Sequence, residues 1–340
     1  MSDWGTRVLA LEPAFRRAPS AHNTQPWTLR AEADAGAEGD ALVLGWDPTR
    51  ELHVGDPTRR DLWLSLGAFA ESVVIAAASD EVGVGVEWDV STRRSIAGRL
   101  VEQPLLTRHF TSEDLAERHS ARGPYAAPWA TIADVDAMAA AAGLAGTGAS
   151  LTVVPGAVVD DLLPVADRWS YEPPALVDEL RHWLRLDHGD PRYREDGLSD
   201  VALALSPAQA GALRVALSPR VWPLLRRAGG PSVLGAASKI DGRGTVVAFH
   251  APVELAARPE DVADLGRALL RVWLAAGARG LRTHPVSVLV DAPATAGPFA
   301  VAVDRAAGQE PGSSRVLSVF RIGRPVDEPI TSARRTVPVG

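Results

Sequence analysis

The chain has 340 residues, of which 46% are hydrophobic, and it carries a formal net charge of −7 and no cysteine. This length suits two domains or one large interlocked domain, and we expect a globular protein with a sizeable core. The acidic balance argues against a nucleic-acid-binding surface, and the lack of cysteine excludes disulfides, thiolate nucleophiles and iron–sulfur clusters, so any redox chemistry needs a borrowed cofactor.

The first residues include Asp3 and Trp4 and contain no apolar segment of signal-peptide length. The longest apolar run, Val73–Ala78, is far shorter than the roughly 20 residues that a membrane-spanning helix needs. We therefore expect a cytoplasmic protein that makes no contact with a membrane.

A run of polar residues between two prolines stands out in the segment 18–29, which reads APSAHNTQPWTL. The prolines bias the residues before them toward extended backbone, so a loop is predicted rather than a helix. Ser20, Asn23 and Gln25 can donate and accept hydrogen bonds, and Trp27 offers a flat apolar surface to a ring. The segment favours a binding loop for a flat ligand with polar edges, although ordinary turns and a core tryptophan use the same residue types.

The next hundred residues or so alternate between strand and helix patterns. Residues 31–40, rich in Ala, Gly and acids, predict a loop between strands at 28–29 and 41–46. Alternation over 82–90 predicts another strand, and α+β structure is expected for this part. An amphipathic helix is predicted from apolar residues at steps of three and four: Leu62, Leu66, Phe69, Val73 and Ala77.

Two arginines four residues apart occur in Arg118-His119-Ser120-Ala121-Arg122-Gly123-Pro124-Tyr125. By themselves they are equally consistent with a solvated helix end. Beyond them, apolar periodicity predicts helices at 132–144, 158–169, 176–186 and 263–278, and strands at 151–154, 245–249, 286–290 and 316–322.

Glycines and prolines interrupt the pattern between residues 187 and 244. This region is either a mobile lid or a set of short packed helices joined by turns. Trp183 and Trp222 favour burial, and therefore packing.

Arg334 and Arg335 end the segment Ala333-Arg334-Arg335. Guanidinium groups match a phosphate dianion, although a solvated basic tail is the alternative. The histidines show no metal-ligand spacing, and His182 and His188 are predicted to lie on the surface. No dinucleotide-binding glycine motif, P-loop or nucleophile elbow is present in the sequence.

The segment from Pro19 to Trp27 resembles, nearly letter for letter, the PSxxNxQPW signature of the nitroreductase family of flavin proteins. Typical members carry an Arg-Arg-Ser-x-Arg phosphate motif before this loop, whereas here the similar stretch from Arg118 to Arg122 comes after it. The reversed order implies a tandem chain similar to the twin-domain Acg-like type. The expected fold is α+β and nitroreductase-like, with a reduced unit at 1–107 and a fuller unit at 108–340 around a shared flavin site.

The resemblance implies one FMN per chain. Backbone amides of the segment Gly280–Val288 would approach flavin N5, and the C-terminal arginines would close the phosphate site. His119 stands where the family has Lys or Arg, which would weaken the phosphate contact or make it pH dependent. The cofactor-binding residues implied are Arg17, Pro19, Ser20, Ala21, His22, Asn23, Gln25, Arg118, His119, Ser120, Arg122, Pro285, Val286, Ser287, Arg334 and Arg335.

The implied activity is FMN-dependent oxidoreduction, with hydride passing from NAD(P)H through FMN to a small acceptor such as a nitroaromatic or a quinone. No catalytic side chain is required, because the flavin carries the chemistry. Two other functions remain open: an FMN-sequestering stress protein with a lid at 187–244, and a biosynthetic flavin dehydrogenase. No metal and no nucleic acid is expected, and the chain is expected to be a monomer or a homodimer.

Overall fold

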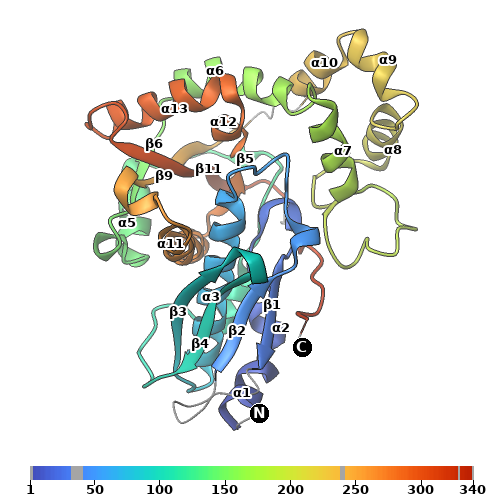
Figure 1. Cartoon of the computed structure of the whole chain (residues 1–340). Coiled ribbons are helices and arrows are strands. Elements are labelled where there is room, and N and C mark those ends of the chain that lie inside the picture. The colour runs from blue at the N-terminus through green and yellow to red at the C-terminus, as the bar shows by residue number, and fades with distance from the viewer. Residues whose placement is uncertain (1–2, 32–40, 238–241, 328–329, 339–340) are drawn as a thin grey trace.

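The computed structural model describes residues 3–31, 41–237, 242–327 and 330–338 (Figure 1). Its first part is a four-stranded antiparallel sheet of β1 (Trp27–Ala31), β2 (Ala41–Trp46), β3 (Val84–Ser91) and β4 (Ile96–Glu102), in the order β1-β2-β4-β3. Short helices α1 (Asp3–Ala10), α2 (Glu12–Phe15) and α4 (Ser112–Glu117) accompany it. The strands predicted at 28–29, 41–46 and 82–90 are confirmed, β4 was missed, and the loop predicted between β1 and β2 lies mostly outside the described residues.

Helix α3 (Arg60–Ser79) follows the predicted periodicity but is buried around almost its whole circumference, so it is a core helix rather than an amphipathic one. It is long and apolar enough to cross a bilayer, yet 89% of its apolar window is buried inside the protein. Its main partner is α11 (Pro259–Gly277). The apolar surface of α3 is therefore covered by other parts of the same chain.

The two long helices approach each other closely at glycines. A Cβ on Gly67 would lie 1.8 Å from the carbonyl oxygen of Ala263, and one on Gly266 would lie 2.4 Å from the carbonyl oxygen of Leu64. Both contacts are far below van der Waals distance, so only glycine permits this crossing. It brings Glu71 of α3 between Arg267 and Arg271 of α11, each at 2.9 Å.

The second sheet is antiparallel, with its strands in the order β10-β11-β9-β6. These strands are β6 (Ser150–Val153), β9 (Thr245–Pro252), β10 (Arg282–Pro285) and β11 (Ser314–Pro325). The two-residue strand β5 (Tyr125–Ala126) also pairs with β11. Helices cover both faces: α6 (Gly156–Trp169), α12 (Val288–Asp291) and α13 (Pro293–Ala306) on one, α11 and α5 (Ile132–Ala141) on the other (Figure 1). Alternate strand residues enter the two cores, as Val246 and Val247 do. The predicted mixed α+β fold is confirmed.

One predicted strand is wrong. Residues 286–290 continue from β10 into the turn and helix α12, and α13, which was not predicted, follows. Pro285 ends β10 and Pro293 begins α13, which suits a residue that lacks an N–H donor. A short apolar run reads alike as a buried strand or as a buried helical turn, which explains the error.

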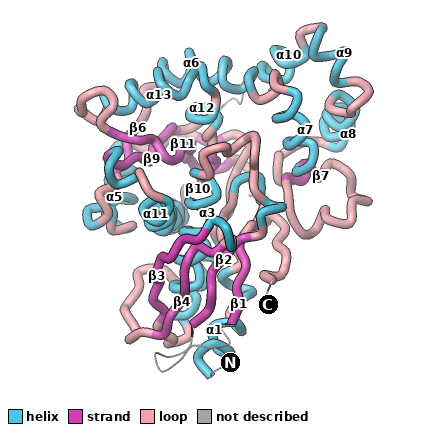
Figure 2. Tube along the Cα trace, viewed as in Figure 1, coloured by secondary structure: helices cyan, strands magenta, loops and turns pink. Residues whose placement is uncertain are grey.

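Helices α7 (Pro174–Trp183), α8 (Pro207–Ala216), α9 (Trp222–Arg227) and α10 (Gly230–Ala237) form a separate cluster, with β7 (Leu184–Arg185) parallel to β8 (Leu198–Ser199). Helix α7 ends before the predicted residue 186 because β7 begins there. Figure 2 shows this cluster as helices joined by loops. Trp183 and Trp222 are buried as predicted, the latter in a small core with Val177 and Leu217. Region 187–244 thus contains short packed helices, and its movement as a lid stays a prediction.

The two sheets fall on either side of residue 107, but one hydrophobic core extends from Trp4 to Val337 and includes residues of both sheets. The proposed division into units 1–107 and 108–340 therefore stays a prediction. A second core, which includes Val246 and Phe299, lies wholly within 108–340.

Candidate functional site

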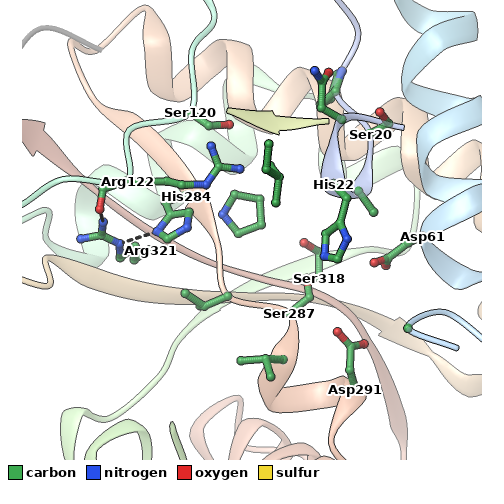
Figure 3. Close-up of a pocket in the computed structure, with 18 of the residues that line it drawn as sticks. Ser20, His22, Asp61, Ser120, Arg122, His284, Ser287, Asp291, Ser318 and Arg321 are labelled. Carbon is green, nitrogen blue, oxygen red and sulfur yellow. Dashed lines mark hydrogen bonds between the residues drawn. The ribbon is translucent and has the colours of Figure 1, made fainter. Parts of the chain in front are cut away.

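A cavity of about 780 Å³ lies between the two sheets, walled by the loop at 17–23, helices α3, α6, α7 and α11, and segments 118–122 and 284–291. Residues from these separate segments face one space in Figure 3. Most of the predicted site residues line it; Gln25 and Arg335 do not. Those that do are Arg17, Pro19, Ser20, Ala21, His22, Asn23, Arg118, His119, Ser120, Arg122, Pro285, Val286, Ser287 and Arg334.

The loop before β1 makes one tight turn, η1 (Ala21–Asn23), instead of remaining extended throughout. His22, Asn23 and Gln25 have φ near +50°, a conformation that costs about 1–3 kcal/mol for residues with a side chain. A hydrogen bond from the Gln25 N–H to Ser20 Oγ, at 2.9 Å, closes the turn. Backbone in this strained region often marks a functional site.

Trp27 does not offer its ring to a ligand. It is fully buried and stacks on Phe69 of α3, with ring centroids 4.8 Å apart and planes at 16°. The predicted ring surface is therefore wrong, and the tryptophan belongs to the core that anchors the loop.

The side-chain amides of Gln25 and Asn23 form hydrogen bonds with other groups of the protein. Gln25 donates to the Glu195 carbonyl at 2.8 Å and accepts from the Arg335 N–H at 2.9 Å. Asn23 lines the cavity, but its Nδ2 donates to the Gly197 and Ala333 carbonyls and its Oδ1 accepts from Arg334 Nη1 at 2.8 Å. Asn23 thus holds Arg334 in place.

Three guanidinium groups gather at one end of the cavity, and we call Arg17, Arg118 and Arg334 the cationic cluster. Nε and Nη1 of Arg118 and Nε of Arg334 are buried without a hydrogen-bond partner. Burial, together with repulsion from Arg17, lowers the pKa of Arg118 to about 9, and burial with repulsion from Arg118 and Arg17 lowers that of Arg334. None of the salt bridges between described residues involves the cluster, so its positive charge and free N–H groups are suited to an anion.

His119 stands beside the cluster, but it is held neutral. Burial is the main cause of its lowered pKa, and neighbouring arginines contribute. Nδ1 lies 2.7 Å from the Glu117 carbonyl, which only accepts, so Nδ1 carries the proton and Nε2 accepts from Thr331 Oγ1 at 2.7 Å. This geometry argues against a charge on His119 that changes between pH 6 and 8.

A second group of donors lies further along the cavity. Arg321 donates from Nε to His284 Nδ1 at 2.8 Å and from Nη2 to the Gly123 carbonyl at 2.7 Å, and its guanidinium lies 4.5 Å from the centroid of the Tyr125 ring. Burial, with Arg122 and Arg321 nearby, holds the pKa of His284 well below its usual value. Figure 3 shows Arg122, His284 and Arg321 on one side of the cavity.

Carboxylates occupy the opposite side of the view, where Asp61 and Asp291 face the cavity near His22 (Figure 3). Arg60 bridges them, with Nη2 2.7 Å from Oδ1 of each. Burial, with Asp61 nearby, raises the pKa of Asp291 to about 7 and that of the neighbouring Asp56 to about 8. The Arg60 guanidinium therefore neutralises several neighbouring carboxyl groups only in part, and these carboxyl groups retain protons at neutral pH.

The backbone from the end of β10 to the first residue of α12 supplies two amides for a ligand at most. Pro285 has no N–H, and the Val286 N–H donates to the Val319 carbonyl at 2.7 Å. The Ser287 N–H has no hydrogen-bond partner within the described residues. The N–H of Val288, the first residue of α12, likewise has no partner within the described residues, so Ser287 and Val288 are the donors that this geometry leaves available.

Sequence reasoning missed Asp61, Asp291 and the role of Arg321. No linear motif contains them; Arg321 meets His284 because β10 and β11 pair in a register that places these residues opposite each other. His182 and His188 are both exposed, in agreement with the surface prediction. His188 lies 3.1 Å from Asp200.

No protein-family model matches the chain, and no curated protein matches it. Solved structures similar to it include the FMN and NADPH-dependent nitroreductase NfnB from sphigopyxis sp. strain HMH, at 21% identity over 63% of this chain and 88% of that chain, with a TM-score of 0.34. NfnB from Mycobacterium smegmatis in complex with NADPH has 17% identity over 63% and 87%, at 0.35. A nitroreductase with bound FMN from Desulfitobacterium hafniense DCB-2 has 14% identity over 66% and 94%, at 0.37. These proteins bear the name of the family that the two motifs resemble, but superpositions this loose carry no residue roles or ligands across.

Proposed function

We propose that the chain is an FMN-dependent oxidoreductase of the nitroreductase type, with the flavin held in the cavity between the two sheets. The observation that carries this proposal is the cationic cluster, in which three buried guanidinium nitrogens, two of Arg118 and one of Arg334, have no acceptor within the described residues. Leaving charged donors unpaired costs free energy, which a bound dianion would offset.

The cluster fits the phosphate of FMN. Arg17, Arg118 and Arg334 would bind it with charge-assisted hydrogen bonds, and Ser120 lies on the same cavity wall. Asn23 fixes Arg334, so the loop at 18–25 acts on the phosphate through that contact. Gln25 and Arg335, which do not line the cavity, would brace the loop against the segment that covers it.

The ring of the flavin would lie toward Arg122, His284 and Ser287. Arg122 donates from Nη1 to the Ala202 carbonyl at 2.8 Å, which holds its guanidinium at the cavity wall. A fixed positive charge and fixed N–H donors stabilise negative charge that develops on a bound ring without the reorganisation that water needs. Apolar side chains of α3 and α11, including Leu64, Ala68 and Leu269, exclude water from this part of the cavity.

When bound, FMN would accept hydride from NAD(P)H and pass it to a small acceptor such as a nitroaromatic or a quinone. The chain's part is to bind, orient and exclude water, and the proposal needs no side chain as a covalent or acid–base catalyst. A cytoplasmic location and a monomeric or homodimeric state belong to the same proposal.

The test is the absorption spectrum and flavin stoichiometry of the purified protein, followed by anaerobic titration with NADPH. We expect about one FMN per chain and bleaching of the flavin band. The double variant R118M/R334M should lose affinity for FMN, whereas its affinity for riboflavin, which lacks the phosphate, should equal that of the wild type. The matched control R324M changes an exposed arginine outside the cavity. A protein that cannot be loaded with FMN would refute the cofactor, and a loaded protein that no nicotinamide reduces would refute the reductase.

A further inference from the structure

Helix α6 presents a stripe of residues to the cavity at steps of three and four: Asp160, Leu163, Pro164 and Asp167. The surrounding wall is mostly apolar. It is formed by Leu163, Pro164, Trp169, Leu176, Leu180 and Leu198 from α6, α7 and β8. Two carboxylates therefore stand in a part of the cavity that is suited to an apolar ligand.

The two carboxylates differ in their partners. Asp160 forms an ion pair with Arg243. Asp167 has no hydrogen bond or ion pair with any described residue, and burial alone raises its pKa to about 6, with no charged neighbour contributing. At neutral pH Asp167 is therefore mainly ionised, and no cation among the residues that the structure describes offsets its burial.

This sets Asp167 apart from the other carboxylates that line the cavity within the described residues. Asp61 and Asp291 share Arg60, and Asp160 has Arg243. A partly buried carboxylate without a counter-charge is costly unless a ligand supplies one. A positively charged ligand group would therefore gain more binding free energy beside the Asp167 carboxylate than beside Asp160 on the same wall.

We propose that Asp167 binds the charged nitrogen of an apolar ligand, a protonated amine whose hydrocarbon or aromatic part packs on α6 and α7. A metal ion does not suit the position, because hard cations need several oxygen ligands and the described residues contain no group of three potential metal ligands. That this amine is the acceptor reduced by the flavin rests on the proposed function; the binding itself does not.

The charges of the cavity support the same assignment. The cationic cluster lies in the wall formed by the loop at 17–23 and segments 118–122 and 332–334, whereas Asp167 belongs to the α6 wall. An anionic cofactor would be drawn to the first and a cationic acceptor to the second, so the two ligands would not compete for one set of charges.

The test compares three probes of equal length on the flavin-free protein at neutral pH: phenylbutylamine, phenylbutanol and phenylbutyrate. Binding is followed by calorimetry and by intrinsic tryptophan fluorescence, to which Trp169 of the same wall contributes. We expect the amine to bind at least about tenfold more tightly than the alcohol, with the carboxylate weakest. D167N should abolish the preference for the amine, whereas D160N should keep it, because Asp160 is already neutralised by Arg243.

An equal affinity for amine and alcohol in the wild type, or a preference that survives in D167N, overturns the inference. Circular dichroism and the thermal midpoint establish that both variants fold; if D167N were unfolded, D167E, which keeps the charge, should retain the preference. Because these probes need no flavin, failure to bind FMN would refute the proposed function and leave this result standing. Where FMN does bind, D167N should raise KM for an amine-bearing nitroaromatic acceptor and leave a neutral acceptor unchanged.

Discussion

Arg321 and His284 face each other across β10 and β11, and Arg321 Nε donates to His284 Nδ1 over 2.8 Å. Because the guanidinium only donates, Nδ1 must be unprotonated, and the neutral imidazole carries its proton on Nε2. No described residue is hydrogen-bonded to Nε2, and His284 lines the cavity. The pair therefore presents a neutral N–H donor to a ligand.

We predict that His284 stays neutral in the Nε2–H form throughout the pH range in which an ordinary histidine titrates. The pKa of His284 is lowered by burial and by Arg122 and Arg321. Nitrogen-15 NMR of the imidazole should show this tautomer at each pH in that range. Protonation of His284 near pH 6.5 would contradict the assigned hydrogen bond.

The same residue affects stability in acid. A folded-state pKa below the unfolded value means that the unfolded state alone takes up a proton as pH falls below about 6.5, so the free energy of unfolding decreases there. H284Q removes this proton uptake, and its thermal midpoint should fall less steeply than that of the wild type between neutral and acid pH. Parallel curves for the two proteins would contradict the expectation.

The cationic cluster should lower the stability of the flavin-free protein, although it would increase the affinity for FMN. R118M removes a buried guanidinium that lies next to Arg17 and has unpartnered nitrogens. We expect the thermal midpoint of the flavin-free protein to rise, and FMN affinity to fall by about 10- to 100-fold, since hydrogen bonds to charged groups contribute about 1.5–3 kcal/mol. R324M, at an exposed position, should change neither. A less stable R118M would show that Arg118 already has a counter-charge.

Asp56 should destabilise the protein at alkaline pH. Burial and Asp61 raise its pKa to about 8 in the folded state, far above the unfolded value of about 3.9. The folded state therefore holds a proton that the unfolded state has lost, and stability declines as pH rises from about 4 to 8.

D56N tests this decline, because the amide oxygen can still accept from the Leu62 N–H, which now donates to Asp56 at 2.9 Å. The variant should be more stable than the wild type at pH 8.5 and similar to it at pH 4, as measured by denaturant unfolding. An equal difference at both pH values would rule out titration of Asp56 as the cause.

Glu71 should be essential for joining α3 to α11. Its carboxylate is fully buried and accepts from Arg267 and Arg271 at 2.9 Å each, which lowers its pKa despite burial. E71A should lower the free energy of unfolding by about 3 kcal/mol, because both guanidinium groups lose their shared buried carboxylate. Arg267 then keeps only its ion pair with the more exposed Asp264. E310A, an exposed site, is the control and should cost little. A loss below about 1 kcal/mol would show that water replaces the carboxylate.

Local patterns predicted much of the fold. The helices at α3, α5, α6 and α11 and the strands β2, β9 and β11 follow from apolar periodicity. The pattern at 286–290 misled, because a run of five residues lacks the length that separates a strand from a helical turn. Strand β4 was missed because Gly98 and Arg99 interrupt its apolar alternation.

The site was foreseen as far as its residues form linear motifs. The loop at 18–25 and the stretch 118–122, distant in sequence, do line one cavity. Trp27 is buried because it stacks on Phe69, and Gln25 is held outside the cavity by its hydrogen bond with the Arg335 N–H. No local sequence pattern reveals either contact. The sequence also did not single out Asp167. It differs from the other cavity carboxylates because it has no ion-pair partner among the described residues, and a sequence pattern does not show this.

Residues 330–338 return to the loop before β1, where Pro338 accepts from the Leu29 N–H at 3.1 Å and Arg334 meets Asn23 across 311 residues of chain. A ribosome releases the loop long before it releases Arg334. The cationic cluster can therefore be assembled only after Arg334 has emerged, 311 residues behind Asn23. An anion bound by the cluster would therefore find its full site only after the segment 330–338 has folded back onto β1 and the loop before it.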